Sequence, residues 1–396
     1  MGRRRSAGGK AEAVSPATSA APQRLAAIDL LRGLTVAFMI LANNNGGEEA
    51  FWFLHHATWN GFTPTDLVFP TFLFLVGVAI PYSAGARAAR GDDRGRLLAH
   101  VFRRSALLFV LGWVVNNFPL FHADTMRVYG VLQRIAACYL VLATAYVGGL
   151  RWRGALALAA GALIGYWLLM RFVPVPGYGV PLREVPLLDP DRNLAAWIDR
   201  QIFSSSHLYE QTRDPEGLLS TLPALATTAL GVMAGLWLRG AASLHAKIRG
   251  IAVAGIVCVA LGALWNFDFP INKKLWTSSF VLFAGGWSLL LLAAMLRLVD
   301  ARGGASDAGD RPAWQKFLLV FGTNTIFAYM LSELLAALLW TIPVGNGVKL
   351  AQVLADFFTR MIPQATAAAT LYSLLYLAVC WAPTWWLCRK RIFLKI

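Results

Sequence analysis

The chain has 396 residues, of which 57% are hydrophobic and only 14% are charged. A soluble domain carries about 25% charged residues, so the composition excludes an ordinary soluble enzyme and predicts a polytopic membrane protein. The formal net charge of +15 does not indicate nucleic-acid binding, because the Lys and Arg residues form short clusters beside apolar runs and not one basic face. We therefore expect a lipid bilayer, and no nucleic acid, around this protein.

The first 24 residues mix basic residues with Ala, Ser, Gly and Pro, a composition too polar to bury a core. We expect residues 1–24 to be a disordered basic cytoplasmic tail and residues 25–396 to form one transmembrane domain. The first apolar run lacks a small-residue cleavage site and leads directly into further apolar runs, so we do not expect a removable signal peptide.

Apolar runs of about 20 residues predict an all-α fold with about ten transmembrane helices. Lys and Arg alternate between the connections: they are frequent in 3–24, absent between the first two runs, and frequent again in 87–104 and 389–395. By the positive-inside rule both termini are cytoplasmic. The predicted helices are 25–43, 66–87, 101–118, 128–149, 152–172, 218–238, 247–265, 277–299, 314–342 and 365–388.

The segment 43–70 joins the first two helices and reads NNNGGEEAFWFLHHATWNGFTPTDLVFP. Histidine has an unperturbed pKa of about 6.5, which allows it to act as a base or nucleophile near neutral pH. His55 and His56 are therefore the natural chemical centre of the chain. The alternative, that the histidines and tryptophans are anchors at the membrane surface, stays open on this segment alone. In a bacterial inner membrane the segment faces the periplasm.

One long polar connection, 173–217, is rich in Pro, Asp and Glu and contains Trp197, His207 and Tyr209. We expect it to cap a site at the outer face. The four cysteines show no CxxC or Cys/His ligand spacing. We therefore expect no disulfide and no metal.

Several polar residues fall inside the predicted helices, where an ionisable group costs about 2.5–3.5 kcal/mol at the helix centre. Asp29 and Arg32 are three residues apart and can form an ion pair near the cytoplasmic surface. Contact between Arg32 and an anionic cofactor is the alternative. Other residues of this kind could equally hold two helices together; they are Gln133, Arg134, Asn324 and Glu333.

Sequence motifs extend over nearly the whole chain. They are DLLRGL (29–34), NNNGG (43–47), HATWNGFTPTDLVFPTFLFLVG (56–77), GVLQRIA (130–136), WIDRQIF (197–203), HLY (207–209), DPEGLLST (214–221), INKKLW (271–276), GTNTIFAY (322–329) and RKRIFLKI (389–396). Together they resemble the transmembrane heparan-α-glucosaminide N-acetyltransferase family and its bacterial relatives.

The resemblance implies a transmembrane N-acetyltransferase that takes an acetyl group from cytosolic acetyl-CoA. It implies transfer of that group to the amino group of a glucosamine on the other side of the membrane. The active-site histidine of the family precedes an Ala-Ser/Thr-Trp-Asn-Gly run, which places it at His56. The family's nearby asparagine falls in the Asn43–Asn45 run, most simply on Asn45.

Two sets of binding residues follow from this resemblance. The pantetheine arm could thread between helices and bring the thioester to His56, which acts either as a covalent acetyl carrier or as a general base. Asp66 has a second interpretation as a helix cap. The amino-sugar acceptor is expected at Asn45, Trp59, Asn60, Asp66, Arg134 and His207, and acetyl-CoA at Arg32, Gln133, Lys274, Trp276 and Asn324.

Other functions stay open at this stage. A membrane O-acyltransferase that modifies a hydroxyl of a surface glycan needs the same base and thioester. A sugar transporter is a further alternative, although the two halves of the chain show no convincing repeat. Animal members carry an N-terminal lumenal domain and one further helix without a counterpart here, so the resemblance bears on acetyl transfer more than on a polymer substrate. A homodimer is also an open alternative.

Overall fold

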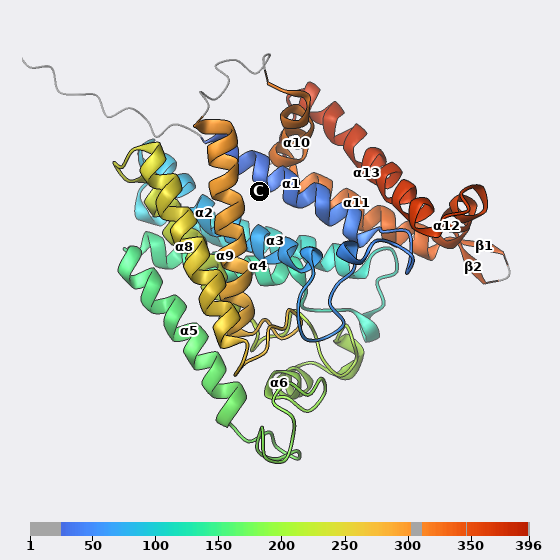
Figure 1. Ribbon diagram of the computed structural model, residues 1–396, viewed down its shortest axis with the longest axis horizontal. Helices are drawn as coiled ribbons and strands as arrows, with labels where there is room; N and C mark the ends of the chain where they lie inside the picture. Colours follow the sequence, from blue (N-terminus) through green and yellow to red (C-terminus); the bar gives the residue numbers. More distant parts are fainter. Residues whose placement is uncertain (1–24, 302–310, 346, 395–396) are drawn as a thin grey trace, which may run out of the picture.

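A computed structural model describes residues 25–301, 311–345 and 347–394. The expected basic tail, 1–24, lies outside these residues. Figure 1 shows a helical protein in which a two-stranded antiparallel hairpin, β1 and β2, is a small appendage beside α12. The all-α prediction is confirmed.

The elements follow the chain in this order: α1 (Ala26–Asn43), η1 (Trp52–Leu54), η2 (Pro64–Leu67), α2 (Val68–Ala88), α3 (Arg94–Asn117), η3 (Ala123–Thr125), α4 (Val131–Val147), α5 (Trp152–Phe172), α6 (Leu194–Ile202), η4 (Ser205–His207), α7 (Thr221–Arg239), α8 (Leu244–Trp265), α9 (Ser278–Met295), η5 (Leu296–Asp300), α10 (Ala313–Thr323), α11 (Thr325–Thr341), β1 (Pro343–Gly345), β2 (Val348–Lys349), α12 (Leu350–Met361) and α13 (Ala365–Arg389).

Among the described residues, 8 helices are long and apolar enough to cross a membrane, and the bent pair α10–α11 brings the number to 9 if it counts as one span. The polytopic prediction is therefore confirmed. α4 has 17 residues and is a shorter apolar helix. The expectation of one continuous helix over 314–342 is wrong, because α10 and α11 meet at Asn324 with a bend of 80°.

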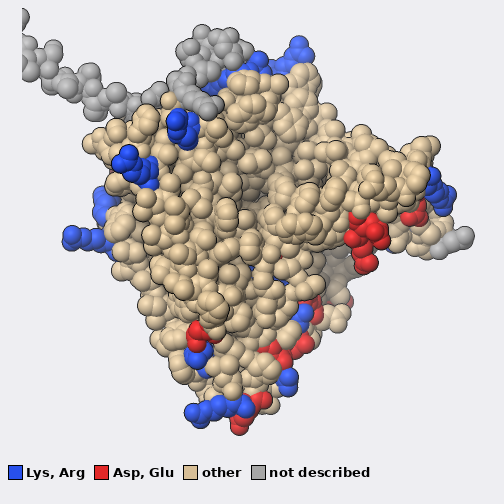
Figure 2. Space-filling model, viewed as in Figure 1, with Lys and Arg blue, Asp and Glu red and all other residues tan. Residues whose placement is uncertain are grey.

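The surface in Figure 2 has a broad uncharged band, with the Lys, Arg, Asp and Glu side chains gathered mainly toward its margins. α8 contributes strongly to the exposed apolar surface of the protein. A soluble monomer rarely exposes so large a contiguous apolar area, whereas lipid tails cover it without cost. The exposed apolar side chains of α8 include Val253, Ile256, Val257, Leu261 and Leu264.

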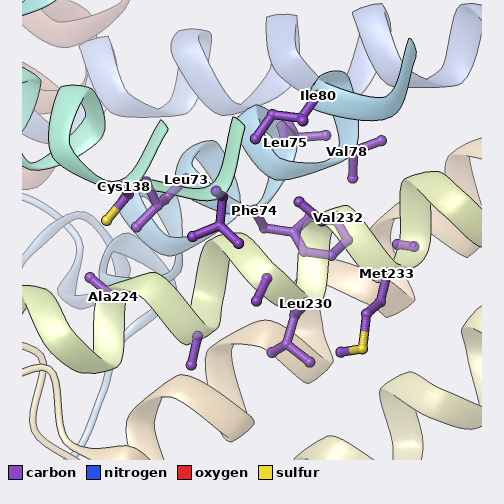
Figure 3. Packing of buried hydrophobic residues seen from close by; sticks show 14 of the residues in the cluster. Leu73, Phe74, Leu75, Val78, Ile80, Cys138, Ala224, Leu230, Val232 and Met233 are labelled. Carbon is purple, nitrogen blue, oxygen red and sulfur yellow. The ribbon is translucent and has the colours of Figure 1, made fainter. Parts of the chain in front are cut away.

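The helices α2 and α7 form the centre of the bundle because glycines allow their backbones to meet. A Cβ atom on Gly77 would lie 2.1 Å from the carbonyl oxygen of Thr228, and one on Gly231 would lie 2.0 Å from the carbonyl oxygen of Phe74. Small residues serve this purpose in membranes, where close van der Waals packing holds helices together. Figure 3 shows part of the resulting cluster, including Leu73, Phe74, Val78, Cys138, Leu230 and Val232.

Candidate active site

The loop between α1 and α2 is organised by one buried carboxylate, Asp66. Its Oδ2 accepts hydrogen bonds from the backbone N–H of Thr63 at 2.9 Å, from Thr63 Oγ1 at 3.2 Å and from the backbone N–H of Ala57 at 3.0 Å. Thr63 and Asp66 form a capping box at the start of η2, which leads directly into α2. Because Ala57 follows His56, the same carboxylate also fixes the backbone beside the histidine.

The second oxygen of Asp66 faces His56, with Oδ1 2.7 Å from Nδ1 of the imidazole. The Asp66 side chain is 1% exposed, whereas that of His56 is 47% exposed. A carboxylate beside Nδ1 favours the tautomer in which Nδ1 carries the proton and Nε2 presents its lone pair. The imidazole is thus arranged to take a proton, or to attack a carbonyl carbon, through Nε2.

Lys273 completes what we call the His56 cluster, which consists of His56, Asp66 and Lys273. Its Nζ lies 2.9 Å from His56 Nδ1, 3.2 Å from His56 Nε2 and 3.5 Å from Asp66 Oδ1. Burial lowers the pKa of the Lys273 amine, while the charges of Asp66 and Glu216 act in the opposite direction. A primary amine, an imidazole and a carboxylate therefore share one small volume.

Two loops distant in sequence are joined to bring Lys273 to this place. The backbone N–H of Gly61 donates to the carbonyl oxygen of Ile271 at 2.8 Å. Beside this bond, Asn272 Nδ2 donates to Asn60 Oδ1 at 3.1 Å. The sequence places Asn60 among the acceptor-binding residues. In the structure its side-chain oxygen instead holds the α8–α9 connection against the loop between α1 and α2, which we call the histidine loop.

A cavity of about 1060 Å³ extends from the His56 cluster along α1. Arg32, Val36, Met39 and Asn43 line it and lie on one face of α1, at i, i+4, i+7 and i+11. At 1.5 Å per residue these positions span about 16 Å. We call the two ends of the cavity the His56 end and the Arg32 end.

The cavity has an extensive apolar wall and two arginines in its lining. Arg32 and Arg104 both line the cavity, and Nε of Arg104 is buried without a hydrogen-bond partner within the described part of the chain. The apolar wall is contributed by α2, α4, α11 and the connection before α9, through Phe69, Phe72, Leu75, Val76, Leu132, Ile135, Trp276, Ile326 and Tyr329.

The His56 end is strongly polar, and segment 173–217 contributes to it. Arg127, between α3 and α4, donates from Nε and Nη2 to Asp214 at 2.9 and 2.6 Å, and from Nη2 to Glu216 at 2.6 Å. Burial opposes the charged form of Glu216, but the charges of Arg127, Arg134 and Lys273, together with the hydrogen bond from Arg127, outweigh it and lower the pKa of this carboxyl. Arg127, Glu210 and Glu216 all line the cavity.

Of the residues expected to bind the acceptor, Asp66 lines the cavity together with His56, and the other five do not. Asn45 donates to the carbonyl oxygen of Leu54 at 3.3 Å and accepts from the N–H of Gly47 at 3.2 Å, so it shapes the histidine loop. Trp59 Nε1 donates to the carbonyl oxygen of Leu188 at 2.8 Å, which fastens segment 173–217 to this loop. The remaining three are Asn60, Arg134 and His207.

Arg134 and His207 are both engaged within the protein. The Arg134 side chain is 0% exposed, donates to the carbonyl oxygen of Gly217 at 3.2 Å, and lies 5.0 Å from the centre of the Trp276 ring. His207 Nδ1 lies 2.7 Å from the carbonyl oxygen of Met126. Arg134 thus packs against Trp276, which lines the cavity, but does not line the cavity itself.

Of the residues expected to bind acetyl-CoA, Arg32, Lys274 and Trp276 line the cavity. Arg32 Nη1 lies 3.0 Å from Asp29 Oδ1, so this arginine makes the helix ion pair and faces the cavity as well. Lys274 lies at the His56 end, where its Nζ is 2.9 Å from Glu210 Oε1. Trp276 is 1% exposed and belongs to the apolar wall of the cavity.

The other two residues of that set, Gln133 and Asn324, lie outside the cavity lining. Gln133 Nε2 donates to the carbonyl oxygen of Phe109 on α3 at 3.3 Å. Asn324 donates to the carbonyl oxygen of Ile392 at 3.0 Å and accepts from the N–H of Leu394 at 3.0 Å. It therefore holds the segment after α13 against the α10–α11 bend, and Leu394 lines the Arg32 end.

Sequence reasoning missed three residues of the His56 end: Lys273, Arg127 and Glu216. Lys273 belongs to INKKLW and Glu216 to DPEGLLST, so both motifs held a usable signal. Arg127 gave no such signal, because a single arginine between two apolar runs looks like the many basic residues that only set membrane topology.

Comparison with known proteins adds a separate finding. Residues 24–262 match the family described as "Heparan-alpha-glucosaminide N-acetyltransferase, catalytic". The human heparan-alpha-glucosaminide N-acetyltransferase is 32% identical over 345 residues, which cover 73% of this chain and 51% of that protein. The mouse protein of the same name is 30% identical over 334 residues, 71% of this chain and 50% of its own length.

The chain thus spans about half the length of the curated relatives it matches. The family match covers more than half of this chain and includes the histidine loop, α2, α4, segment 173–217 and α7. The chain therefore belongs to the heparan-alpha-glucosaminide N-acetyltransferase catalytic family.

Proposed function

We propose that this protein is a membrane acetyltransferase that moves an acetyl group from acetyl-CoA to the amino group of a glucosamine-type sugar. The observation that carries the proposal is one cavity whose lining includes both the His56–Asp66 pair and two arginines, Arg32 and Arg104. Donor and acceptor can enter such a cavity from different ends and meet at His56.

The Arg32 end suits the donor. Coenzyme A carries several phosphate charges, and guanidinium groups are the side chains best matched to phosphate. Arg32 supplies one such group and Arg104 adds a second to the cavity lining, with a buried Nε that makes no hydrogen bond to the described residues. The apolar wall of the cavity suits the uncharged pantetheine arm, which would bring the thioester to the His56 end.

The reaction at the His56 end has two forms that balance equally. In direct transfer, the sugar amine attacks the thioester carbonyl carbon, the C–S bond breaks, and His56 Nε2 takes the proton from nitrogen and passes it to the CoA sulfur. In the covalent form, Nε2 itself attacks the thioester carbonyl carbon and the C–S bond breaks, so CoA leaves as a thiolate that takes a proton from water. The amine then attacks the acetyl carbon, the bond from that carbon to Nε2 breaks, and the proton that the amine releases goes to water. In both forms Asp66 stabilises the positive charge that develops on the ring.

The residues around His56 suit a polar acceptor. Glu210 and Glu216 line this end, where they are paired with Lys274 and Arg127, and their oxygens can still accept hydrogen bonds from sugar amino and hydroxyl groups. On α1 and α11, Asn43 Nδ2 donates to Glu333 Oε1 at 3.0 Å, which adds a further polar pair to the lining. The closely related alternative, acetylation of a glycan hydroxyl, would use the same base, but a hydroxyl is harder to deprotonate than an amine is to use as a nucleophile.

The distribution of Lys and Arg in the sequence supports an orientation in which the Arg32 end is cytoplasmic and the His56 end faces the periplasm. Acetyl-CoA would then enter from the cytoplasm across a bacterial inner membrane. In this arrangement segment 173–217 covers the acceptor side.

The proposal is tested with purified protein in sealed vesicles, with acetyl-CoA on one side of the membrane and the sugar on the other. We expect acetyl transfer to glucosamine and none to N-acetylglucosamine, which has no free amine. Acetylation of N-acetylglucosamine would indicate an O-acyltransferase. Sugar uptake without consumption of acetyl-CoA would indicate a transporter.

A further inference from the structure

Lys273 places a primary amine at the point where the acetyl group must arrive. Its Nζ lies 2.9 Å from His56 Nδ1 and 3.2 Å from Nε2, the nitrogen that presents the reactive lone pair, and the residue lines the cavity. The amine of a sugar acceptor has to reach the same neighbourhood. Any acetyl group brought to His56 is therefore within reach of the protein's own amine.

The surroundings of Lys273 increase its nucleophilic character. A lysine attacks a carbonyl carbon only as the neutral amine, and burial favours that form by lowering the pKa of Lys273. The loop that carries it is fixed, because Asn272 is bonded through its side chain to Asn60 and to the backbone N–H of Leu275 at 2.9 Å. These bonds fix the loop, so Nζ of Lys273 stays beside His56.

We infer that Lys273 is a self-acetylation site, at which the protein acetylates its own Nζ when no sugar acceptor occupies the His56 end. The inference rests on the proposed function, since it takes acetyl-CoA as the donor. The neutral Nζ attacks the thioester carbonyl carbon, a C–N bond forms and the C–S bond breaks. His56 Nε2 takes the proton released from Nζ and passes it to the CoA sulfur, so the products are acetyl-lysine and CoA thiol.

The modification would change the site in two ways. Acetyl-lysine is neutral, so the positive charge 3.5 Å from Asp66 Oδ1 is lost. The added acetyl group also occupies space beside His56 Nε2, where the sugar amine must bind. Self-acetylation therefore lowers the rate of sugar acetylation, and the sugar protects the enzyme by occupying the position first.

Lys274 is a matched internal control because it follows Lys273 on the same loop and also lines the His56 end. Its side chain is 31% exposed, compared with 19% for Lys273, and its Nζ is paired with Glu210 Oε1 at 2.9 Å. Uncatalysed acetylation by free acetyl-CoA would favour the more exposed amine. A preference for the more buried Lys273 therefore reports catalysis within the His56 cluster.

The experiment incubates the purified full-length protein with acetyl-CoA, with and without glucosamine, and measures acetylation of each lysine by peptide mass spectrometry. We expect acetylation of Lys273 to exceed that of Lys274 by at least about tenfold, since proximity to a bound reactant raises rates far more than this. Added glucosamine should suppress the modification, and His56→Gln should abolish it. Lys273→Arg confirms the assignment of the modified peptide.

Three results would overturn the inference: equal acetylation of Lys273 and Lys274, acetylation that persists in His56→Gln, or acetylation of glucosamine by a protein whose Lys273 stays unmodified in the absence of sugar. The last result would leave the proposed function standing. If neither glucosamine nor Lys273 is acetylated, the proposed function fails and the inference fails with it. Suppression by glucosamine is measured on the unaltered protein, so the test does not depend on a variant that folds.

Discussion

The substitution Asp66→Asn separates the two tasks of one carboxylate. Oδ2 of Asp66 accepts three hydrogen bonds that hold the loop, whereas Oδ1 faces His56 Nδ1. Asparagine retains an oxygen for the loop but places an amide N–H₂ group against the imidazole. Nδ1 must then accept a hydrogen bond, so the ring proton moves to Nε2 and the lone pair needed for catalysis is lost.

The size of the effect follows from the exposure of the histidine. In serine proteases the equivalent exchange lowers kcat about 10⁴-fold. His56 is 47% exposed, so its ring can turn and be solvated more readily than a buried one, and we expect a smaller loss. A decrease in kcat of about 10²–10³-fold corresponds to about 3–4 kcal/mol of lost transition-state stabilisation. The cap survives, so the free energy of unfolding should fall by no more than about 1–3 kcal/mol.

The assay measures initial rates of acetyl transfer to glucosamine over a range of donor and acceptor concentrations, together with thermal unfolding followed by tryptophan fluorescence. Asp66→Ala is the matched variant, because it removes the cap and the imidazole partner together and should lose both activity and stability. An Asp66→Asn enzyme with unaltered kcat and a lowered Tm would refute the reasoning and leave Asp66 as a helix cap alone.

Three further predictions concern two other residues of the cavity lining, Arg127 and Arg32, and the buried Asp199 on α6. Arg127→Met leaves two buried carboxylates without their cation, which should destabilise the fold by about 3–5 kcal/mol; an unchanged Tm would contradict this. Arg32→Ala should weaken CoA binding about tenfold in isothermal titration with an unchanged KM for glucosamine, and unchanged CoA affinity would return this arginine to its helix ion pair. Burial raises the pKa of Asp199 to about 7 from 3.8, so the folded protein favours the neutral carboxyl group. The stability that this preference provides is fully present below pH 4 and is lost as the pH rises through 7. Asp199→Asn should therefore become more stable than the native protein over this range, by on the order of 4 kcal/mol at neutral pH, and a pH-independent difference in Tm would disprove it.

The helices could be predicted because the bilayer imposes a length and an apolar composition on each of them. The bend between α10 and α11 could not, since the sequence around Asn324 reads as one apolar run. Asn324, at the break, donates one hydrogen bond to Ile392 and accepts one from Leu394, 68 and 70 positions later in the chain. A contact so distant in sequence leaves no trace in local hydropathy.

In the candidate site, too, residues that are close together in the sequence could be predicted, and those that only the fold brings together could not. His56 and Asp66 lie ten residues apart in one loop, and their residue types made this loop a candidate for chemistry, with membrane anchoring and a helix cap as the open alternatives. Lys273 lies 217 residues from His56 and could be associated with it only through the fold. Trp59 and Asn60 have the side chains of sugar-binding residues, but their polar atoms are used to join loops, a distinction that residue type cannot make.

The central claim is that His56 performs the transfer, and the most direct test compares His56→Ala with His55→Ala. His55 is turned into its own loop, with Nε2 3.2 Å from the carbonyl oxygen of Ala50, and it does not line the cavity. We expect His56→Ala to lower acetyl transfer to glucosamine by at least about 10²–10⁴-fold while CoA binding is retained. His55→Ala should keep most of its activity. An active His56→Ala protein, or an equal loss in both variants, would show that His56 does not perform the transfer.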